Sequence, residues 1–149
     1  MKVDIMTLTK IFSGMEKWSE AINDNFQQII TKVPWTSDGI VYKNGWTQFT
    51  DNELVYTYGS FGANNFIAVG GQISYPNIPA SQFSVTPFAL PISVFNGQKN
   101  WAVSPVIANF DGNLYRPFPD TSTGDINLRR TTNTALTANT MVINFIMIH

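Results

Sequence analysis

The chain has 149 residues, which is enough for one compact domain with a short appendage but not for two domains of usual size. Its net charge is -1 and only 13% of its residues are charged, so it lacks the basic surface that sequence-independent nucleic-acid binding requires. It contains no cysteine and one histidine, His149, which excludes a thiolate nucleophile and a Cys/His zinc cluster, and we expect neither a metal nor a cofactor.

No membrane-spanning or secretory segment is predicted. The N-terminus lacks the apolar core of a secretion signal. The longest apolar run, residues 141–148, is interrupted by Asn144 and falls well short of the ~20 residues that span a bilayer. We therefore expect a soluble protein without membrane insertion.

The first predicted element is a short helix. Ser13 and Glu16 form an S-x-x-E capping box, so the helical part should run from about Met15 to Lys32. A helix of ~25 Å is too short to be stable alone, and its apolar stripe therefore needs a partner. Most residues of the stripe are apolar and recur at a spacing of three and four: Met15, Trp18, Ile22, Asn25 and Ile29.

The stripe has two interpretations. The helix either packs on its own domain or gathers several copies of the chain. Asn25 favours the second, because a polar residue on a helical seam usually sets the register or the number of subunits. Pro34 cannot continue a helix and disfavours a helical Val33. We therefore predict an oligomerising helix within residues 1–33 and a separate domain within residues 34–149.

The second domain is predicted to be an antiparallel β-barrel or sandwich. Short runs rich in Val, Ile, Phe, Tyr and Thr are separated by turn signals. Asn44-Gly45 and Asp111-Gly112 are the strongest hairpin signals, and Asn96-Gly97 and Thr123-Gly124 are weaker ones. The predicted strands cover residues 40–43, 46–50, 53–58, 66–74, 83–87, 92–95, 101–109, 113–117, 125–129 and 140–148.

Two of these strands are unusual. The pair Gly70-Gly71 removes side chains where another backbone comes close or where the strand bends. The strand at 140–148 is apolar on both faces, whereas a half-solvated strand would alternate. Either the same chain covers both faces, or one face fills the domain and the other meets neighbouring subunits.

Two groups of residues are candidates for saccharide binding. Such binding combines an aromatic platform for the apolar face of a sugar with planar polar groups for its hydroxyls. The first group is Trp101, Asn109, Asp111, Tyr115 and Arg116. The second is Trp46, Asp51, Glu53, Tyr56 and Tyr58. For each aromatic residue the alternative is ordinary packing in the core or between subunits.

The adjacent Arg129 and Arg130 should point to opposite faces of a strand, so that one of them can reach a phosphate or carboxylate.

Catalysis has little support. Asp111, Asp120 and Asp125 offer a carboxylate pair for glycoside hydrolysis, but each lies at a turn where Asp is expected. We expect a protein that is not an enzyme.

A family resemblance adds to this reading. Residues 10–15 (KIFSGM) and 20–29 (EAINDNFQQI) resemble the N-terminal helix of receptor-binding proteins at the baseplates of siphophages that infect lactic-acid bacteria and related Gram-positives. Residues 69–74 (VGGQIS) are similar to a Gly-Gly strand near the start of that family's head domain. Residues 110–115 (FDGNLY) and the closing apolar strand are similar to those of many phage tail head domains.

The resemblance implies a homotrimer in the virion, assembled in the host cytoplasm. Its helices would bundle and attach to other baseplate proteins, and its β-barrel heads would bind host cell-wall polysaccharide. The chain departs from the family in two respects, because Pro34 leaves no room for a neck and no internal histidine lies near Asp111-Gly112. The alternative is a structural baseplate or decoration trimer whose head contacts other virion proteins without binding saccharide.

Overall fold

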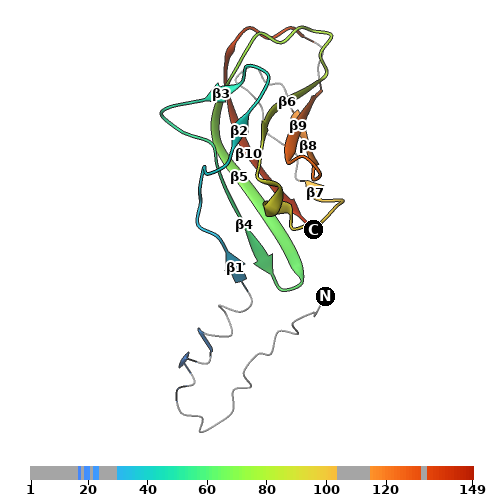
Figure 1. Cartoon of the computed structure of the whole chain (residues 1–149). Helices are drawn as coiled ribbons and strands as arrows, with labels where there is room; N and C mark the ends of the chain where they lie inside the picture. Colours follow the sequence, from blue (N-terminus) through green and yellow to red (C-terminus); the bar gives the residue numbers. More distant parts are fainter. Residues whose placement is uncertain (1–16, 18, 21, 24–29, 104–114, 132–133) are drawn as a thin grey trace.

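The computed structural model describes residues 17, 19–20, 22–23, 30–103, 115–131 and 134–149 (Figure 1). This part of the chain is mainly β, as predicted, and its antiparallel strands form two sheets. Within the described ranges the strands do not close into a barrel. No helix there is long and apolar enough to cross a membrane.

The larger sheet has six strands. Five follow the order β1-β4-β5-β10-β7, and β3 pairs with β5 beside this path. The central strands β5 and β10 pair without interruption from Tyr75 opposite Asn139 to Phe66 opposite Ile148. The strand bounds are β1 Ile30–Lys32, β3 Thr47–Gln48, β4 Val55–Phe61, β5 Asn64–Tyr75, β7 Ala102–Val103 and β10 Asn139–Ile148.

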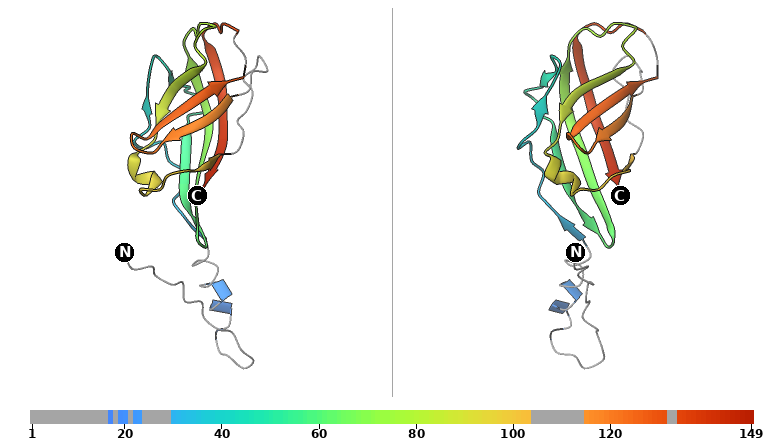
Figure 2. Two further views of the ribbon diagram at one scale, coloured as in Figure 1. Left: turned by 90° about the vertical axis from the view of Figure 1, so that its right-hand side faces the viewer. Right: turned by 45° about the vertical axis from the view of Figure 1, so that its right-hand side comes forward.

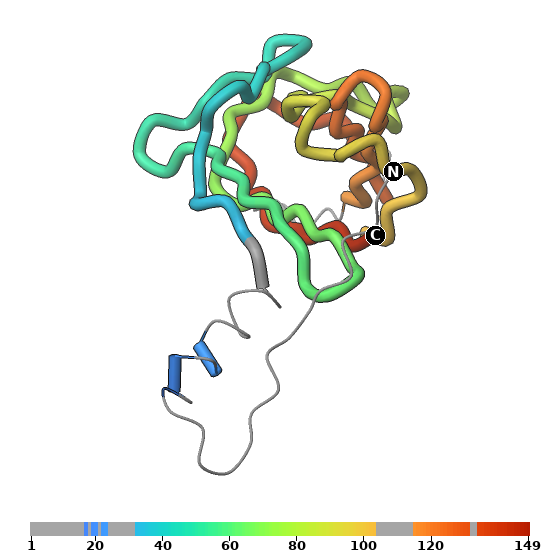
Figure 3. Tube along the Cα trace, turned by 60° about the horizontal axis from the view of Figure 1, so that its bottom comes forward, coloured from blue at the N-terminus to red at the C-terminus, as the bar shows by residue number. Residues whose placement is uncertain are grey.

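The smaller sheet has four strands in the order β2-β6-β9-β8. The two sheets face each other (Figure 2), and seen end-on the chain surrounds the space between them (Figure 3). Apolar side chains from both sheets fill that space, among them Ile67, Phe88, Leu128 and Ile143. The bounds are β2 Val41–Tyr42, β6 Ser84–Ala89, β8 Tyr115–Asp120 and β9 Asp125–Arg130.

Strand β10 has one buried and one exposed face. Met141, Ile143, Phe145 and Met147 are buried in the core, although the sequence, apolar on both faces, did not show which face would be buried. On the other face Ile146 and Ile148 are 39% and 46% exposed. Within the described residues this end of the second face is therefore only partly covered.

The close approach predicted at Gly70-Gly71 is confirmed. Gly71 has φ +134°, and a Cβ atom there would lie 2.3 Å from the carbonyl oxygen of Glu53 and 2.7 Å from Cα of Leu54. A Cβ atom on Gly70 would lie 3.1 Å from Oδ1 of Asn144. The segment that enters β4 thus runs directly over this part of β5, and no side chain fits between the two.

The turn at Asn44-Gly45 forms as predicted, but it does not make a hairpin. Asn44 and Gly45 have φ of 53° and 80°, and the N–H of Trp46 donates to the carbonyl of Lys43 at 2.9 Å. The flanking strands β2 and β3 nevertheless belong to different sheets. The turn chemistry is local, whereas the choice of sheet depends on partners that are distant in sequence.

Two other turns do join paired strands. Gly124, with φ +80°, lies in the turn between β8 and β9, in the region of the weaker signal at Thr123-Gly124. Gly62, with φ +59°, lies first in the two-residue turn between β4 and β5, as a type II′ turn requires. The hairpin predicted at Asp111-Gly112 lies outside the described residues.

The strand predicted at residues 92–95 is wrong, because this segment is the 3-10 helix η1, Ile92–Phe95. The N–H of Val94 donates to the carbonyl of Pro91 at 3.0 Å, and Asn96 ends the helix in the left-handed conformation with φ 48°. Pro91 has a fixed φ at the start of the 3-10 helix, and Asn96 turns the chain at its end. The apolar side chains between them could not by themselves distinguish the two structures.

The structure does not support the N-terminal helix that was predicted from about Met15 to Lys32. Met15, Trp18, Asn25 and Ile29 lie outside the described residues, and Ile22, with helical backbone, is described as half-buried. The predicted end of the helix is wrong, because residues 30–32 form β1, which pairs with β4. Their backbone groups gain ladder hydrogen bonds from β4.

Candidate functional site

A cleft lies between residues 99–103 and the edge strand β8. It is about 830 Å³ in volume and is lined by residues 99–103 and 116–122. Each wall comes from the margin of one sheet, since Ala102 and Val103 pair with β10 in the larger sheet and β8 is the outer strand of the smaller sheet. A volume within 300–1,000 Å³ is typical of small-molecule sites.

The first wall depends on an unusual stretch of backbone after η1. Asn96, Gly97 and Asn100 all have positive φ, at 48°, 69° and 63°. Asn and Gly adopt this conformation more readily than other residues do. The chain therefore changes direction within these five residues. Trp101 then lines the cleft, and Ala102 pairs with the end of β10.

The structure brings two of the five predicted saccharide-binding residues to this cleft. Trp101 and Arg116 both line it, one from each wall. Tyr115 precedes Arg116 on β8, but its side chain is turned into the core and is 1% exposed. Asn109 and Asp111 lie outside the described residues.

Trp101 is mainly a packing residue within one chain. It is 9% exposed, and its ring contacts Phe95 edge-on at a centroid distance of 6.0 Å and His149 at 5.7 Å. Its indole Nε1 is buried and has no hydrogen-bond partner among the described residues. A sugar ring cannot stack on a face that is already covered, so Trp101 shapes the wall of the cleft and offers at most its N–H.

The second candidate group does not form an open site. Trp46 and Tyr56 are buried, and Trp46 packs against Tyr75 with ring centroids 5.7 Å apart. The hydroxyl of Tyr56 donates to the carbonyl of Asp38 at 2.9 Å. Burial is the largest cause that raises the pKa of the Tyr56 hydroxyl, followed by the nearby Tyr58. The rest of the group is placed as follows: Asp51 and Glu53 are exposed, and Tyr58 is half-buried.

The exposed aromatic residue of the cleft is Phe118, which the sequence analysis missed. It is 39% exposed, and the guanidinium carbon of Arg116 lies 5.2 Å from the centre of its ring. The signal was present in the alternation of residues 115–120, which places Arg116 and Phe118 on the same face of β8. The strand predicted at residues 113–117 ended before Phe118, whereas β8 continues to Asp120.

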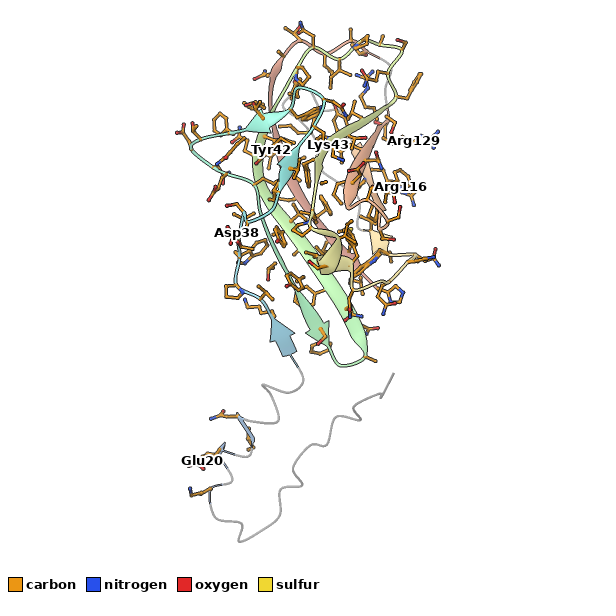
Figure 4. The ribbon with its side chains drawn as sticks, in the orientation of Figure 1. Glu20, Asp38, Tyr42, Lys43, Arg116 and Arg129 are labelled. Atoms are coloured by element: carbon orange, nitrogen blue, oxygen red, sulfur yellow. The ribbon has the colours of Figure 1, made fainter. Side chains whose placement is uncertain are left out.

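Arg129 and Arg130 point to opposite faces of β9, as predicted. Arg129 is exposed and lies opposite Arg116 on β8, and Figure 4 shows both side chains on the same side of the smaller sheet. Arg130 is buried and donates to three main-chain carbonyls: Thr134 at 2.9 Å, Pro79 at 3.0 Å and Ala80 at 3.3 Å. Arg129 is thus available to a ligand, whereas Arg130 joins two loops.

Asp120 gives the cleft an ionised carboxylate. Its Oδ1 accepts hydrogen bonds from the hydroxyl of Ser122 at 2.6 Å and from the N–H of Ser122 at 3.0 Å. These two bonds, the hydroxyl's first, hold the pKa of Asp120 below its usual value. The cleft therefore combines an aromatic ring, two cations from Lys99 and Arg116, and one fixed anion.

No match with known proteins adds to these observations. The chain was compared with models of known families, with curated proteins and with solved structures, and none matches. Among the described residues, no three His, Cys, Asp or Glu side chains lie together as metal ligands would. What the cleft binds follows only from its own geometry.

Proposed function

We propose that the chain is a phage receptor-binding protein, a homotrimeric adhesin whose head attaches the virion to host cell-wall saccharide through the cleft beside β8. The observation that carries this proposal is the grouping of Phe118, Arg116 and Asp120 along one open cleft. It is supported by the antiparallel β fold and by the resemblance of residues 10–29 to baseplate proteins of siphophages.

The side chains of the cleft match the alternating surface of a sugar. Arg116 lies over one face of the Phe118 ring, and the part of the ring that remains exposed suits the apolar surface of a pyranose. The guanidinium of Arg116 donates to ring hydroxyls or to an acidic substituent. Asp120 accepts hydrogen bonds from hydroxyls. We therefore assign the aromatic role that was predicted for Trp101 and Tyr115 to Phe118.

The trimeric part of the proposal is supported by the outer face of the larger sheet. Phe61, Phe66, Ile146 and Ile148 surround an apolar depression of about 240 Å³ near the turn between β4 and β5. Exposed apolar groups of this kind usually mark interfaces. Strand β1 pairs with Phe61 at the same place, so subunits joined by the segment before residue 30 would meet here.

The alternative function is a structural baseplate or decoration trimer that contacts other virion proteins without binding saccharide. The burial of Trp101, Tyr115, Trp46 and Tyr56 favours it, because each of these predicted platforms packs within a single chain. The two functions differ in one respect that can be measured. Only the adhesin retains host cell-wall polysaccharide.

The test is binding of the purified full chain to polysaccharide released from host cell walls. Phe118→Ala and Arg116→Ala should each weaken binding at least about tenfold, which corresponds to about 1.4 kcal/mol. Phe83→Ala is the matched control, since Phe83 is 51% exposed but does not line the cleft. Light scattering should give the same mass for all three variants.

Two results would contradict the proposal. Unmodified protein that neither decorates host cells nor binds wall polysaccharide would favour the structural alternative. Equal binding by Phe118→Ala and Phe83→Ala would show that the ligand does not bind in the cleft.

A further inference from the structure

We propose that two main-chain carbonyl groups at the outer edge of β8, those of Pro117 and Pro119, bind hydroxyl groups of the ligand, and that the prolines close this edge to peptide strands. The inference rests on the proposed function, because it concerns the same cleft. It adds the chemistry by which the cleft would select a hydroxyl-rich ligand over a polypeptide.

The direction of these carbonyl groups follows from the pairing of β9. The N–H of Arg130 donates at 2.9 Å to the carbonyl that precedes β6, so Arg130 and the alternate residues Leu128 and Ile126 direct their backbone groups toward β6. Leu128 and Ile126 lie opposite Pro117 and Pro119. The backbone groups of both prolines therefore point away from β9 and out of the sheet.

The outward side of β8 is part of the cleft. In the described part of the chain β8 is the last strand of its sheet, and residues 116–122 line the cleft. Proline has no N–H group, so positions 117 and 119 offer acceptors without the donors that a strand edge normally has beside them. The two oxygens are separated by about 7 Å, twice the rise per residue of an antiparallel strand.

An edge of this kind distinguishes between classes of ligand. An added peptide strand needs both donors and acceptors from the edge, and two of the donors are missing. A hydroxyl group needs only an acceptor for its hydrogen. Carbonyl groups also attract cations, but Lys99 and Arg116 in the same cleft disfavour a cationic ligand. A ligand rich in hydroxyl groups is the class that remains.

The first experiment measures the carbonyl groups directly. Carbonyl ¹³C shifts of the labelled full chain are followed while glucose, galactose, N-acetylglucosamine or glycerol is added. At least one of them should move the signals of Pro117 and Pro119, while its fully O-methylated derivative, which has no hydroxyl donor, should not. Pro34, an exposed proline outside the cleft, is the internal control. Unchanged signals, or equal shifts with the methylated compounds, would overturn the proposal.

The second experiment restores the missing donors. The double variant Pro117→Ala with Pro119→Ala has an N–H group at each position. At low protein concentration both new amides should exchange with deuterium rapidly, because they face an open edge. At high concentration the double variant should form larger assemblies by edge pairing, and Pro34→Ala should not. Slow exchange, or a mass equal to that of Pro34→Ala at high concentration, would overturn the proposal.

The outcomes separate this inference from the function on which it rests. If the unmodified protein binds wall polysaccharide and the carbonyl signals do not respond to it, the edge inference fails and the adhesin function stands. If the signals respond to simple sugars and wall polysaccharide is not bound, the reverse holds.

Discussion

Arg116 and Arg129 lie directly opposite each other on the antiparallel strands β8 and β9, with both side chains on the exposed face of the smaller sheet. Among the described residues, neither forms an ion pair with an acidic side chain. Like charges at such positions repel, because directly opposite residues in a sheet have adjacent Cβ atoms. The pair therefore reduces stability while it concentrates positive charge beside the cleft.

Replacing one member of this pair should stabilise the fold. Arg129→Thr is expected to raise the free energy of unfolding by roughly 0.5 kcal/mol, because it removes the repulsion and places a β-branched residue in the strand. The gain should shrink in high salt, which screens exposed charges. Urea denaturation at low and high salt measures both effects, with Lys99→Thr as the control. A gain that does not depend on salt would show that repulsion is not its cause.

The neighbouring arginine should behave in the opposite way. Arg130 is 5% exposed, and its guanidinium donates to the carbonyls of Thr134, Pro79 and Ala80. Arg130→Met leaves these acceptors without their donor and is expected to lower the free energy of unfolding by about 1–3 kcal/mol. Denaturation should show no comparable loss for Arg129→Met. Equal stability of the two variants would contradict the structural role of Arg130.

A third prediction concerns the close contact at Gly71. Gly71→Ala places a methyl group 2.3 Å from the carbonyl oxygen of Glu53 at a φ of +134°. Gly62→Ala shares the strain of positive φ, at +59°, but a Cβ atom there meets nothing within 4 Å. The strain alone costs about 1–2 kcal/mol, and the clash should make Gly71→Ala clearly less stable than Gly62→Ala in thermal unfolding. Similar melting temperatures of the two variants would show that the segment before β4 shifts to make room for the methyl group.

A fourth prediction concerns pH. The pKa of Asp120 is held below its usual value, first by the hydroxyl of Ser122 and then by its N–H. The stability that these bonds contribute is present above the pKa of the unfolded chain and is lost as the pH falls through the lower folded pKa. Ser122→Ala should raise the pKa of Asp120 in an NMR titration. Thr121→Ala is the control, and an unchanged pKa in Ser122→Ala would assign the effect to the backbone.

The fifth prediction tests the outer face of the larger sheet. Ile148→Glu adds a charge to the apolar surface around Phe61 and Phe66, and in a trimer that buries this surface the charge would be desolvated. The variant should have the mass of a monomer in light scattering, while Phe83→Glu should keep the mass of the unmodified protein. A trimer that survives Ile148→Glu would place the interface elsewhere.

The features that were predicted well are those signalled by the types of residue in a short stretch of sequence. The strand predicted at residues 140–148 is present as β10, and Gly70-Gly71 marked the position of a close backbone contact. The positive φ of Asn44 and Gly45 likewise follows from the residue types, because Asn tolerates this conformation and Gly has no Cβ atom to oppose it. In each case the residue types themselves carry the signal, although the contact at Gly71 is made with Glu53, which is distant in the chain.

The features that were missed depend on distant partners. Residues 30–32 form a strand because β4 lies beside them, and β2 and β3 separate because their partners are in different sheets. The same holds for the site, where Arg116 was predicted but the covered face of Trp101 results from contact with Phe95 and His149. Phe118 was within reach of sequence analysis, had the strand predicted at 113–117 been continued past Pro117 as an edge strand.

The pairing of β5 with β10 also constrains the order in which the protein folds. These strands form the centre of the larger sheet, yet they lie far apart in the chain. Until residues 139–148 have left the ribosome, β5 has β4 and β3 as partners but nothing on its other side, and the inner face of the sheet is incomplete. The core between the sheets is therefore completed only after residues 139–148 have been synthesised, and the domain should fold slowly for its size.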